Sequence, residues 1–154
     1  MMNRENFVHY TLGVPEMDAE HWNLFELLNQ LRTAINERNV ELANDILSDF
    51  EEGVESHILH EERLMKKWSY PYVNSHANDY PVNVHRLIDG HHLRHDRHDR
   101  QVLYTDCTKM EVELSHHIDW HDMQYVPYYR KWIATNTSST PSHHVNEYDS
   151  MCTA

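Results

Sequence analysis

The sequence predicts an all-α protein: an antiparallel up-down four-helix bundle with an N-terminal arm and a disordered C-terminal tail. Two observations lead to this prediction. Apolar residues recur at steps of three and four over four long stretches, the period of an amphipathic helix. The chain also holds only three Gly and five Pro in 154 residues, too few for a turn-rich all-β protein. Short loops between long helices favour antiparallel neighbours.

The length is that of one domain with a substantial core. We assign residues 1–133 to the bundle, with residues 1–16 as an extended arm. Residues 134–154 form the predicted disordered tail, because from Ala134 onward the chain is small and polar.

Pro15 and Asp18 mark the start of the first helix, which closes at Glu37, Arg38 and Asn39. Its apolar stripe consists of Met17, His21, Leu24, Leu28, Leu31 and Ile35. Asn39 is the expected cap of a second helix over 40–68. The stripe of that helix is Ala43, Ile46, Phe50, Val54, His57, Glu61, Leu64 and Trp68. Gly53 lies within it, at a cost of about 1 kcal/mol relative to Ala.

A third helix is predicted to begin near Val73, and Pro81 should kink or restart it. Its inward positions are Val73, His76, Tyr80, Val84, Leu87 and Ile88. A fourth helix is expected over 101–121, with Asp122 near its end. Its inward positions are Leu103, Cys107, Met110, Leu114 and His117. The aromatic segment 126–133, which contains Pro127, is expected to pack against the bundle.

Composition and charge narrow the function classes. The formal net charge is -12, which argues against nucleic-acid binding. No apolar run approaches the ~20 residues of a membrane span, and the start lacks the pattern of a signal peptide. Cys107 and Cys152 are the only cysteines, and Cys152 falls in the polar tail. We therefore expect no structural disulfide and a cytoplasmic location.

Ligand-type residues occupy inward positions on every predicted helix. Glu61 follows His57 by four residues and shares its helix face, which is otherwise apolar. An unpaired buried carboxylate costs several kcal/mol, so such a group normally pairs with a cation or a metal. Each histidine alone is more often a hydrogen-bonded core residue than a ligand. Together, the imidazoles and carboxylates suit iron, zinc or manganese, and two carboxylates able to bridge favour a two-metal site.

At this point the sequence resembles the hemerythrins, particularly the single-domain bacterial type, over about residues 6–130. Four segments carry the resemblance: LGVPEMDAEHWNLFELLNQL, HILHEERLM, SYPYVNSH and HIDWHDMQY. The resemblance implies a metal site with these ligands: His21, His57, Glu61, His76, His117 and Asp122. It implies two iron ions (Fe2+/Fe3+) bridged by Glu61 and Asp122. It also implies that His21 and His57 hold one iron and leave an open position for dioxygen.

One position departs from the family pattern. The family has a His four residues after His76, whereas this sequence has Tyr80, followed by Pro81. Three interpretations stay open. Tyr80 ligates iron as a phenolate, Tyr80 points inward without ligating, or the kink at Pro81 brings His85 to the vacant position. A phenolate would favour ferric iron, which gives the hypothesis of rapid autoxidation.

The resulting functional prediction is a non-enzymatic di-iron protein that binds dioxygen for carriage, storage or sensing. Two alternatives remain: a di-iron oxidase or peroxidase on the same fold, and a mononuclear or metal-poor descendant that serves as a binding module. The His-rich segment 91–98 is interpreted as a solvated helix end rather than a metal site. His60 and His116 are expected to point away from the site, and His121 is a candidate to contact a ligand. Trp22, Trp68 and Trp120 are expected in the core or lining the pocket.

Overall fold

The structure is a computed structural model that describes residues 11–76, 86–90 and 100–137. All regular elements within these ranges are helical, which confirms the predicted all-α class. The elements are α2 (Pro15–Asn36), α3 (Val40–Lys67), α4 (Val73–His76), α6 (Arg100–Trp120), the 3-10 helix η2 (Asp122–Gln124) and α7 (Val126–Thr137). Residues 86–90 are also helical.

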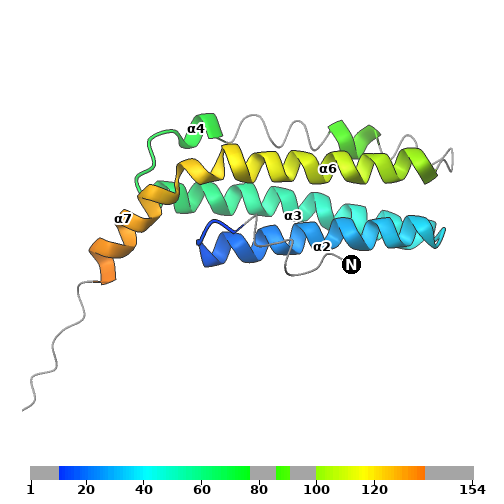
Figure 1. Ribbon diagram of the computed structural model, residues 1–154, viewed down its shortest axis with the longest axis horizontal. Coiled ribbons are helices and arrows are strands. Elements are labelled where there is room, and N and C mark those ends of the chain that lie inside the picture. Colours follow the sequence, from blue (N-terminus) through cyan, green and yellow to red (C-terminus); the bar gives the residue numbers. More distant parts are fainter. Residues whose placement is uncertain (1–10, 77–85, 91–99, 138–154) are drawn as a thin grey trace, which may run out of the picture.

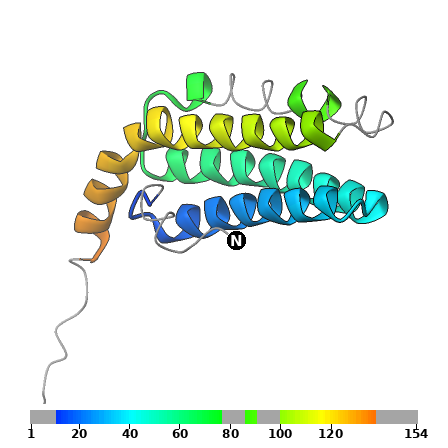
Figure 2. The same cartoon turned by 45° about the vertical axis from the view of Figure 1, so that its right-hand side comes forward.

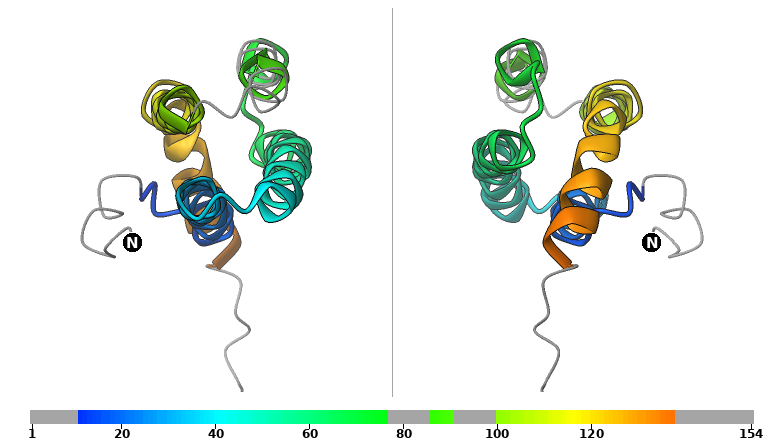
Figure 3. Two further views of the ribbon diagram at one scale, coloured as in Figure 1. Left: turned by 90° about the vertical axis from the view of Figure 1, so that its right-hand side faces the viewer. Right: turned by 90° about the vertical axis from the view of Figure 1, so that its left-hand side faces the viewer.

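The long helices α2, α3 and α6 lie side by side (Figures 1 and 2). α2 runs antiparallel to α3, and α6 runs in the same direction as α3. In the end-on views of Figure 3, α2 lies next to both α3 and α6, while α4 and residues 86–90 fall on the fourth corner. This arrangement brings the N-terminal end of α2 next to the C-terminal ends of α3 and α6.

The start of α2 is held by a side chain one turn inside the helix. Pro15 occupies the first turn, where its missing N–H costs nothing. The Asp18 carboxylate accepts hydrogen bonds from the backbone N–H groups of Leu12 at 2.7 Å and Gly13 at 3.0 Å. Gly13 has a φ of 77°, a left-handed conformation that favours glycine. The chain therefore turns into α2 at the predicted residue.

The predicted cap between α2 and α3 is confirmed. The Asn39 side-chain oxygen accepts a hydrogen bond from the N–H of Leu42 at 3.1 Å, satisfying a donor that the first turn of a helix leaves without an intrahelical partner. α3 begins at Val40 and ends at Lys67, one residue before the predicted limit.

The core consists of the predicted stripes. Every stripe residue named for the first, second and fourth helices is buried, so the period of three and four identified the inward faces. Val73 and Ile88 are also buried, while Tyr80 and Val84 lie outside the described residues. Gly53 has a packing role, because a Cβ there would lie 2.9 Å from Leu24 Cδ2. The missing side chain lets α2 and α3 approach closely at this level.

The prediction for Trp120 was wrong. Its side chain is 66% exposed and stacks on the exposed ring of His116 at 5.9 Å between centroids. Trp120 is the last residue of α6, where no described element covers that face. Trp68 is buried as expected.

The aromatic segment 126–133 packs on the bundle end as expected, with Tyr129 against Trp68. Tyr125, directly before the segment, also contacts Trp68. α7 runs to Thr137, four residues beyond the assigned boundary at 133. The remainder of the assigned tail, 138–154, lies outside the described residues. None of the described helices combines the length and apolar character that a membrane crossing requires.

Candidate metal centre

Five of the predicted ligand residues meet at one end of the bundle. His21 comes from the second turn of α2, and His57 and Glu61 come from successive turns of α3. His117 lies in the last turn of α6, and Asp122 begins η2 directly after it. All five side chains are at most 1% exposed. The fold therefore places three imidazoles and two carboxylates out of contact with bulk water.

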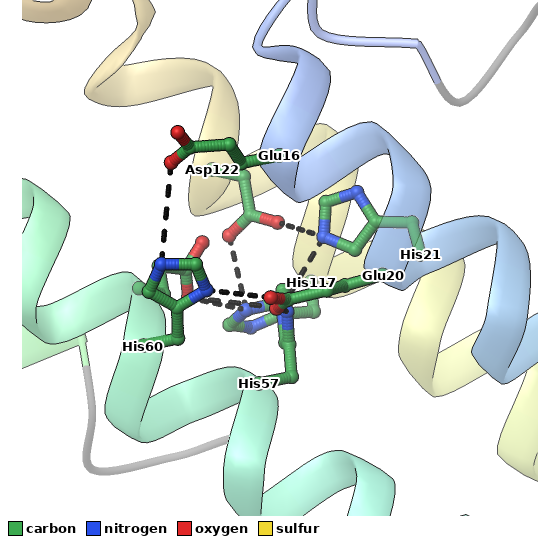
Figure 4. A network of polar contacts seen from close by, with 8 residues as sticks. Glu16, Glu20, His21, His57, His60, His117 and Asp122 are labelled. Carbon is green, nitrogen blue, oxygen red and sulfur yellow. Dashed lines mark hydrogen bonds and ion pairs between the residues drawn. The ribbon is translucent and has the colours of Figure 1, made fainter.

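Four of these residues bring ligand atoms close together. One ligand atom each from His21, His57, Glu61 and Asp122 lies within 4.8 Å of the others. The Nε2 atoms of His21 and His57 are 3.2 Å apart. Figure 4 shows His21, His57, His117 and Asp122 pointing toward one another from α2, α3, α6 and η2.

The Asp122 carboxylate faces two different histidines. Its Oδ2 lies 3.1 Å from His21 Nε2, and its Oδ1 lies 3.0 Å from His117 Nε2. Glu61 Oε2 is 3.4 Å from His117 Nε2 and 4.0 Å from His57 Nε2. Both carboxylates therefore stand between imidazoles of α6 and imidazoles of the α2–α3 pair.

The buried carboxylates change the proton affinity of the histidines. Burial alone lowers the pKa of His117, but the charges of Asp122 and Glu61 and their hydrogen bonds outweigh it and raise the pKa to about 10. Burial likewise lowers the pKa of His57, and the hydrogen bond with Glu20 and the Glu61 charge reverse this and raise it. The centre attracts positive charge, and a metal ion would compete with these protons.

A residue that sequence reasoning missed, Glu20, supports the site from α2. Its Oε2 lies 2.9 Å from His57 Nδ1, and its Oε1 lies 2.5 Å from His60 Nδ1 (Figure 4). Although burial raises the pKa of Glu20, the hydrogen bonds with both histidines lower it overall. A carboxylate on the outer nitrogen fixes the ring orientation of a metal-ligating histidine.

The ring of His60 was expected to point away from the site, and it lies outside the cluster of ligand atoms. His60 is 29% exposed, so it contacts Glu20 from the surface side. The spacing of His57 and His60 could have indicated that both rings share one partner, because residues three apart on a helix are neighbours. His116 is exposed, as expected. His121 stacks on His117 at 5.6 Å between ring centroids, so it does contact a candidate ligand.

Tyr125 was missed as well. Its side chain is fully buried, at 0% exposure. Burial raises the pKa of Tyr125 well above its ordinary value, and the charges of Asp122 and Glu61 raise it further. Tyr125 therefore stays a neutral phenol beside one of the two carboxylates.

The other predicted residues are only partly placed. His76 is the last residue of α4, and the structure describes its backbone alone. Tyr80, His85 and the segment 91–98 lie outside the described residues, so the three interpretations of Tyr80 stay predictions. The helix that ends at His76, α4, lies on the fourth corner of the bundle, beside α3.

The donor set fits an iron-type metal. Imidazole nitrogens and carboxylate oxygens suit iron, zinc and manganese. Two buried carboxylates are costly without a compensating positive charge, which protons on the imidazoles or a bound metal ion would supply. The only thiol near the described core, Cys107, lies on α6 more than two turns before His117, so thiolate does not enter the cluster.

Comparison with known proteins agrees with this geometry. Residues 12–129 match the family described as Hemerythrin HHE cation binding domain. The chain is 24% identical over 78 residues to a protein named Bacteriohemerythrin from Stenotrophomonas maltophilia (strain R551-3). That match covers 51% of each chain, so the chain spans about half the length of the curated relative. No solved structure matches significantly. Since the family match extends over most of the sequence, this chain belongs to the hemerythrin family.

Proposed function

We propose that this protein binds two iron ions at the buried end of the bundle and binds dioxygen there, for carriage, storage or sensing. Membership of the hemerythrin family and a buried cluster of His, Glu and Asp make it a metal-binding, hemerythrin-like protein. Proteins of this family are in general non-enzymatic oxygen-binding proteins. The two irons, their bridging and the dioxygen are the proposal.

The arrangement of Asp122 carries the proposal of two metal ions. Its two oxygens approach His21 and His117 separately, at 3.1 and 3.0 Å. A single ion would draw imidazoles toward one point, whereas a carboxylate with a different histidine at each oxygen is suited to bridge two ions. Glu61 lies between His57 and His117 and would be the second bridge.

The protein's own residues would have defined tasks. His21 and His57 would hold the first iron, and His76 and His117 the second. Glu20 would fix the orientation of His57 through Nδ1. Leu24, Val54 and Ile118 are buried and lie within one helical turn of His21, His57 and His117 along the chain, so they would help to exclude water from the cluster. Bound iron would supply the redox chemistry that dioxygen binding requires.

Metal analysis with absorption spectra tests the proposal. Iron-loaded protein should hold two irons per chain and develop a new absorption band in air that disappears when oxygen is removed. One iron or none per chain would contradict the di-iron proposal and favour the metal-poor alternative. Turnover of peroxide with a reductant, without a reversible oxygen spectrum, would favour the oxidase or peroxidase alternative.

Tyr80 needs its own test. A Tyr80 phenolate on iron would give a visible charge-transfer band, which the Tyr80→Phe variant would lack. Retention of the band in Tyr80→Phe and its loss in His85→Ala would point to His85 instead. We propose that the native protein autoxidises quickly in air, and an oxygenated spectrum stable for hours would contradict this.

A cytoplasmic location is also part of the proposal. The free, buried thiol of Cys107 is compatible with a reducing compartment. Fractionation of cells that express the protein tests this location, and recovery outside the cytoplasmic fraction would contradict it.

A further inference from the structure

A connected group of aromatic side chains leads from the metal centre to the protein surface. We call it the aromatic column, and its members are Trp68, Tyr70, Tyr72, Tyr125, Tyr128 and Tyr129. They come from the end of α3, the loop before α4, the turn after η2 and the first turn of α7. The proposed function uses none of them.

Tyr125 is the inner end of the column. It is fully buried, and its backbone N–H donates a hydrogen bond to the carbonyl oxygen of Asp122, a candidate bridging ligand, at 3.1 Å. One branch leads from Tyr125 to Trp68 at 5.4 Å between ring centroids, and on to Tyr129 at 5.1 Å. The other leads from Tyr125 to Tyr70 at 6.4 Å, and on to Tyr72 at 5.8 Å and to the partly exposed Tyr128 at 5.2 Å.

Both branches end where solvent reaches the rings. Tyr72 is 63% exposed, and Tyr129 is partly exposed. The intermediate rings of Trp68 and Tyr70 are each 5% exposed. A donor in solution can therefore supply an electron only at the exposed end of each branch. From there the electron would move inward between neighbouring rings that exclude water.

Trp132 is not a favourable end point. The Lys67 ammonium lies 4.4 Å from the centre of its ring. A cation over the ring stabilises the neutral indole and opposes removal of an electron from it. We therefore do not include Trp132 in the column.

The residue types matter as much as the contacts. Tyrosine and tryptophan lose one electron far more readily than phenylalanine or aliphatic side chains. The core between α2 and α3 is filled by Phe25, Phe50 and leucines, which would pack the bundle end equally well. The column instead contains only side chains that can be oxidised and reduced reversibly.

We propose that the aromatic column passes electrons singly from the surface to the metal centre when hydrogen peroxide oxidises that centre. Hydrogen peroxide takes up two electrons and two protons and becomes two waters. Each electron leaves Tyr72 or Tyr129 together with its phenol proton, which passes to water. A one-electron donor in solution, such as an ene-diol or a phenol, then returns a hydrogen atom to the tyrosyl radical. The column thereby protects the buried ligands from oxidation.

This inference rests on the proposed function, since it needs redox-active iron at the cluster. The test uses the iron-loaded full-length protein, treated with hydrogen peroxide without a reductant. Freeze-quench electron paramagnetic resonance detects the protein radical, and peptide mass spectrometry locates oxidised tyrosines. We expect oxidation at Tyr72 and Tyr129, and its suppression when ascorbate is added.

Branch-specific variants provide the sharpest result. Tyr70→Phe should abolish oxidation at Tyr72 and leave that at Tyr129. Trp68→Phe should do the reverse, and Tyr125→Phe should abolish both. Tyr104→Phe, at an exposed tyrosine near the N-terminal end of α6, is the matched control and should change neither. If Trp68→Phe does not fold, Tyr70→Phe and Tyr125→Phe still decide the question, because each removes a single oxygen atom.

An unchanged oxidation pattern in Tyr70→Phe and Tyr125→Phe would overturn the inference. So would equal oxidation in metal-free protein, which would show direct attack by peroxide. Iron content and absorption spectra, measured on each sample first, separate this failure from failure of the proposed function. Protein with two irons but no radical at Tyr72 or Tyr129 would refute the column alone, and protein without iron would refute both.

Discussion

Glu20 on α2 reaches across to α3, where its Oε2 lies 2.9 Å from Nδ1 of His57. The Nε2 of the same imidazole faces His21 at 3.2 Å, inside the cluster. One ring is therefore held at its outer nitrogen by a partly exposed carboxylate and presents its inner nitrogen to the site. This contact sets the orientation of a candidate ligand and can be tested without disturbing the ligands themselves.

Replacing Glu20 by Gln should lower metal affinity by about 10- to 100-fold, the usual cost of losing a partner that orients a ligand. The amide keeps the size of the side chain but removes its charge. Titration with iron against a competing chelator measures the change. Glu16→Gln is the matched control, because Glu16 is 63% exposed and its Oε2 is 4.0 Å from His60 Nε2. Equal losses in both variants would mean that the effect is general electrostatics rather than ligand orientation.

Metal binding should stabilise the fold. A ligand that binds only the folded state adds about 2.7 kcal/mol when its free concentration is 100 times its dissociation constant. Thermal unfolding with and without ferrous iron under anaerobic conditions measures this gain. Asp122→Asn removes a buried carboxylate and should lose most of it. A gain of the same size in Asp122→Asn would show that the stabilising ion binds elsewhere.

The close approach at Gly53 predicts a non-additive pair of substitutions. Gly53→Ala should add up to about 1 kcal/mol through helix propensity, but its new Cβ meets Leu24 Cδ2 at 2.9 Å. In native protein we therefore expect little gain or a loss. In a Leu24→Ala background, where the obstructing methyl is absent, Gly53→Ala should stabilise. Urea unfolding of the four proteins in this cycle measures the coupling, and purely additive effects would contradict the packing argument.

The thiol of Cys107 predicts a loss of stability at high pH. Burial raises the pKa of this thiol from 9.0 to about 12. Below pH 9 the thiol is protonated in both the folded and the unfolded state, and the full stability is present. Between pH 9 and about 12 only the unfolded chain ionises, so stability falls across that window by up to roughly 4 kcal/mol.

The measurement compares urea unfolding of wild type and Cys107→Ala at rising pH, both in a Cys152→Ser background. The alanine variant should be less stable at neutral pH, because it leaves a cavity, and the difference should narrow above pH 9. Parallel curves for the two proteins would contradict the prediction. The native thiol should also react slowly with alkylating reagents, since the thiolate is the nucleophile.

Much of the fold was predictable because its determinants are local. Pro15 and Asn39 act on their own helix ends, and the stripes follow from the period of one helix. The same locality explains the error at Trp120. The burial of a residue in the last turn of a helix depends on which other elements pack against that turn. The apolar stripe of α6 alone does not show that none of the described elements covers Trp120.

The sequence by itself determined the class of fold and the inward faces of the helices. It also determined the five candidate ligands that meet at the N-terminal end of α2. Their identities are a matter of residue type and spacing along single helices. Only the tertiary structure decided that Asp122 faces His21 and His117 with separate oxygens, that Glu20 joins His57 to His60, and that Tyr125 connects the cluster to an aromatic column. These contacts join different helices. They depend on the axial register of α2 against α3 and on side-chain rotamers, and no spacing within one helix encodes either.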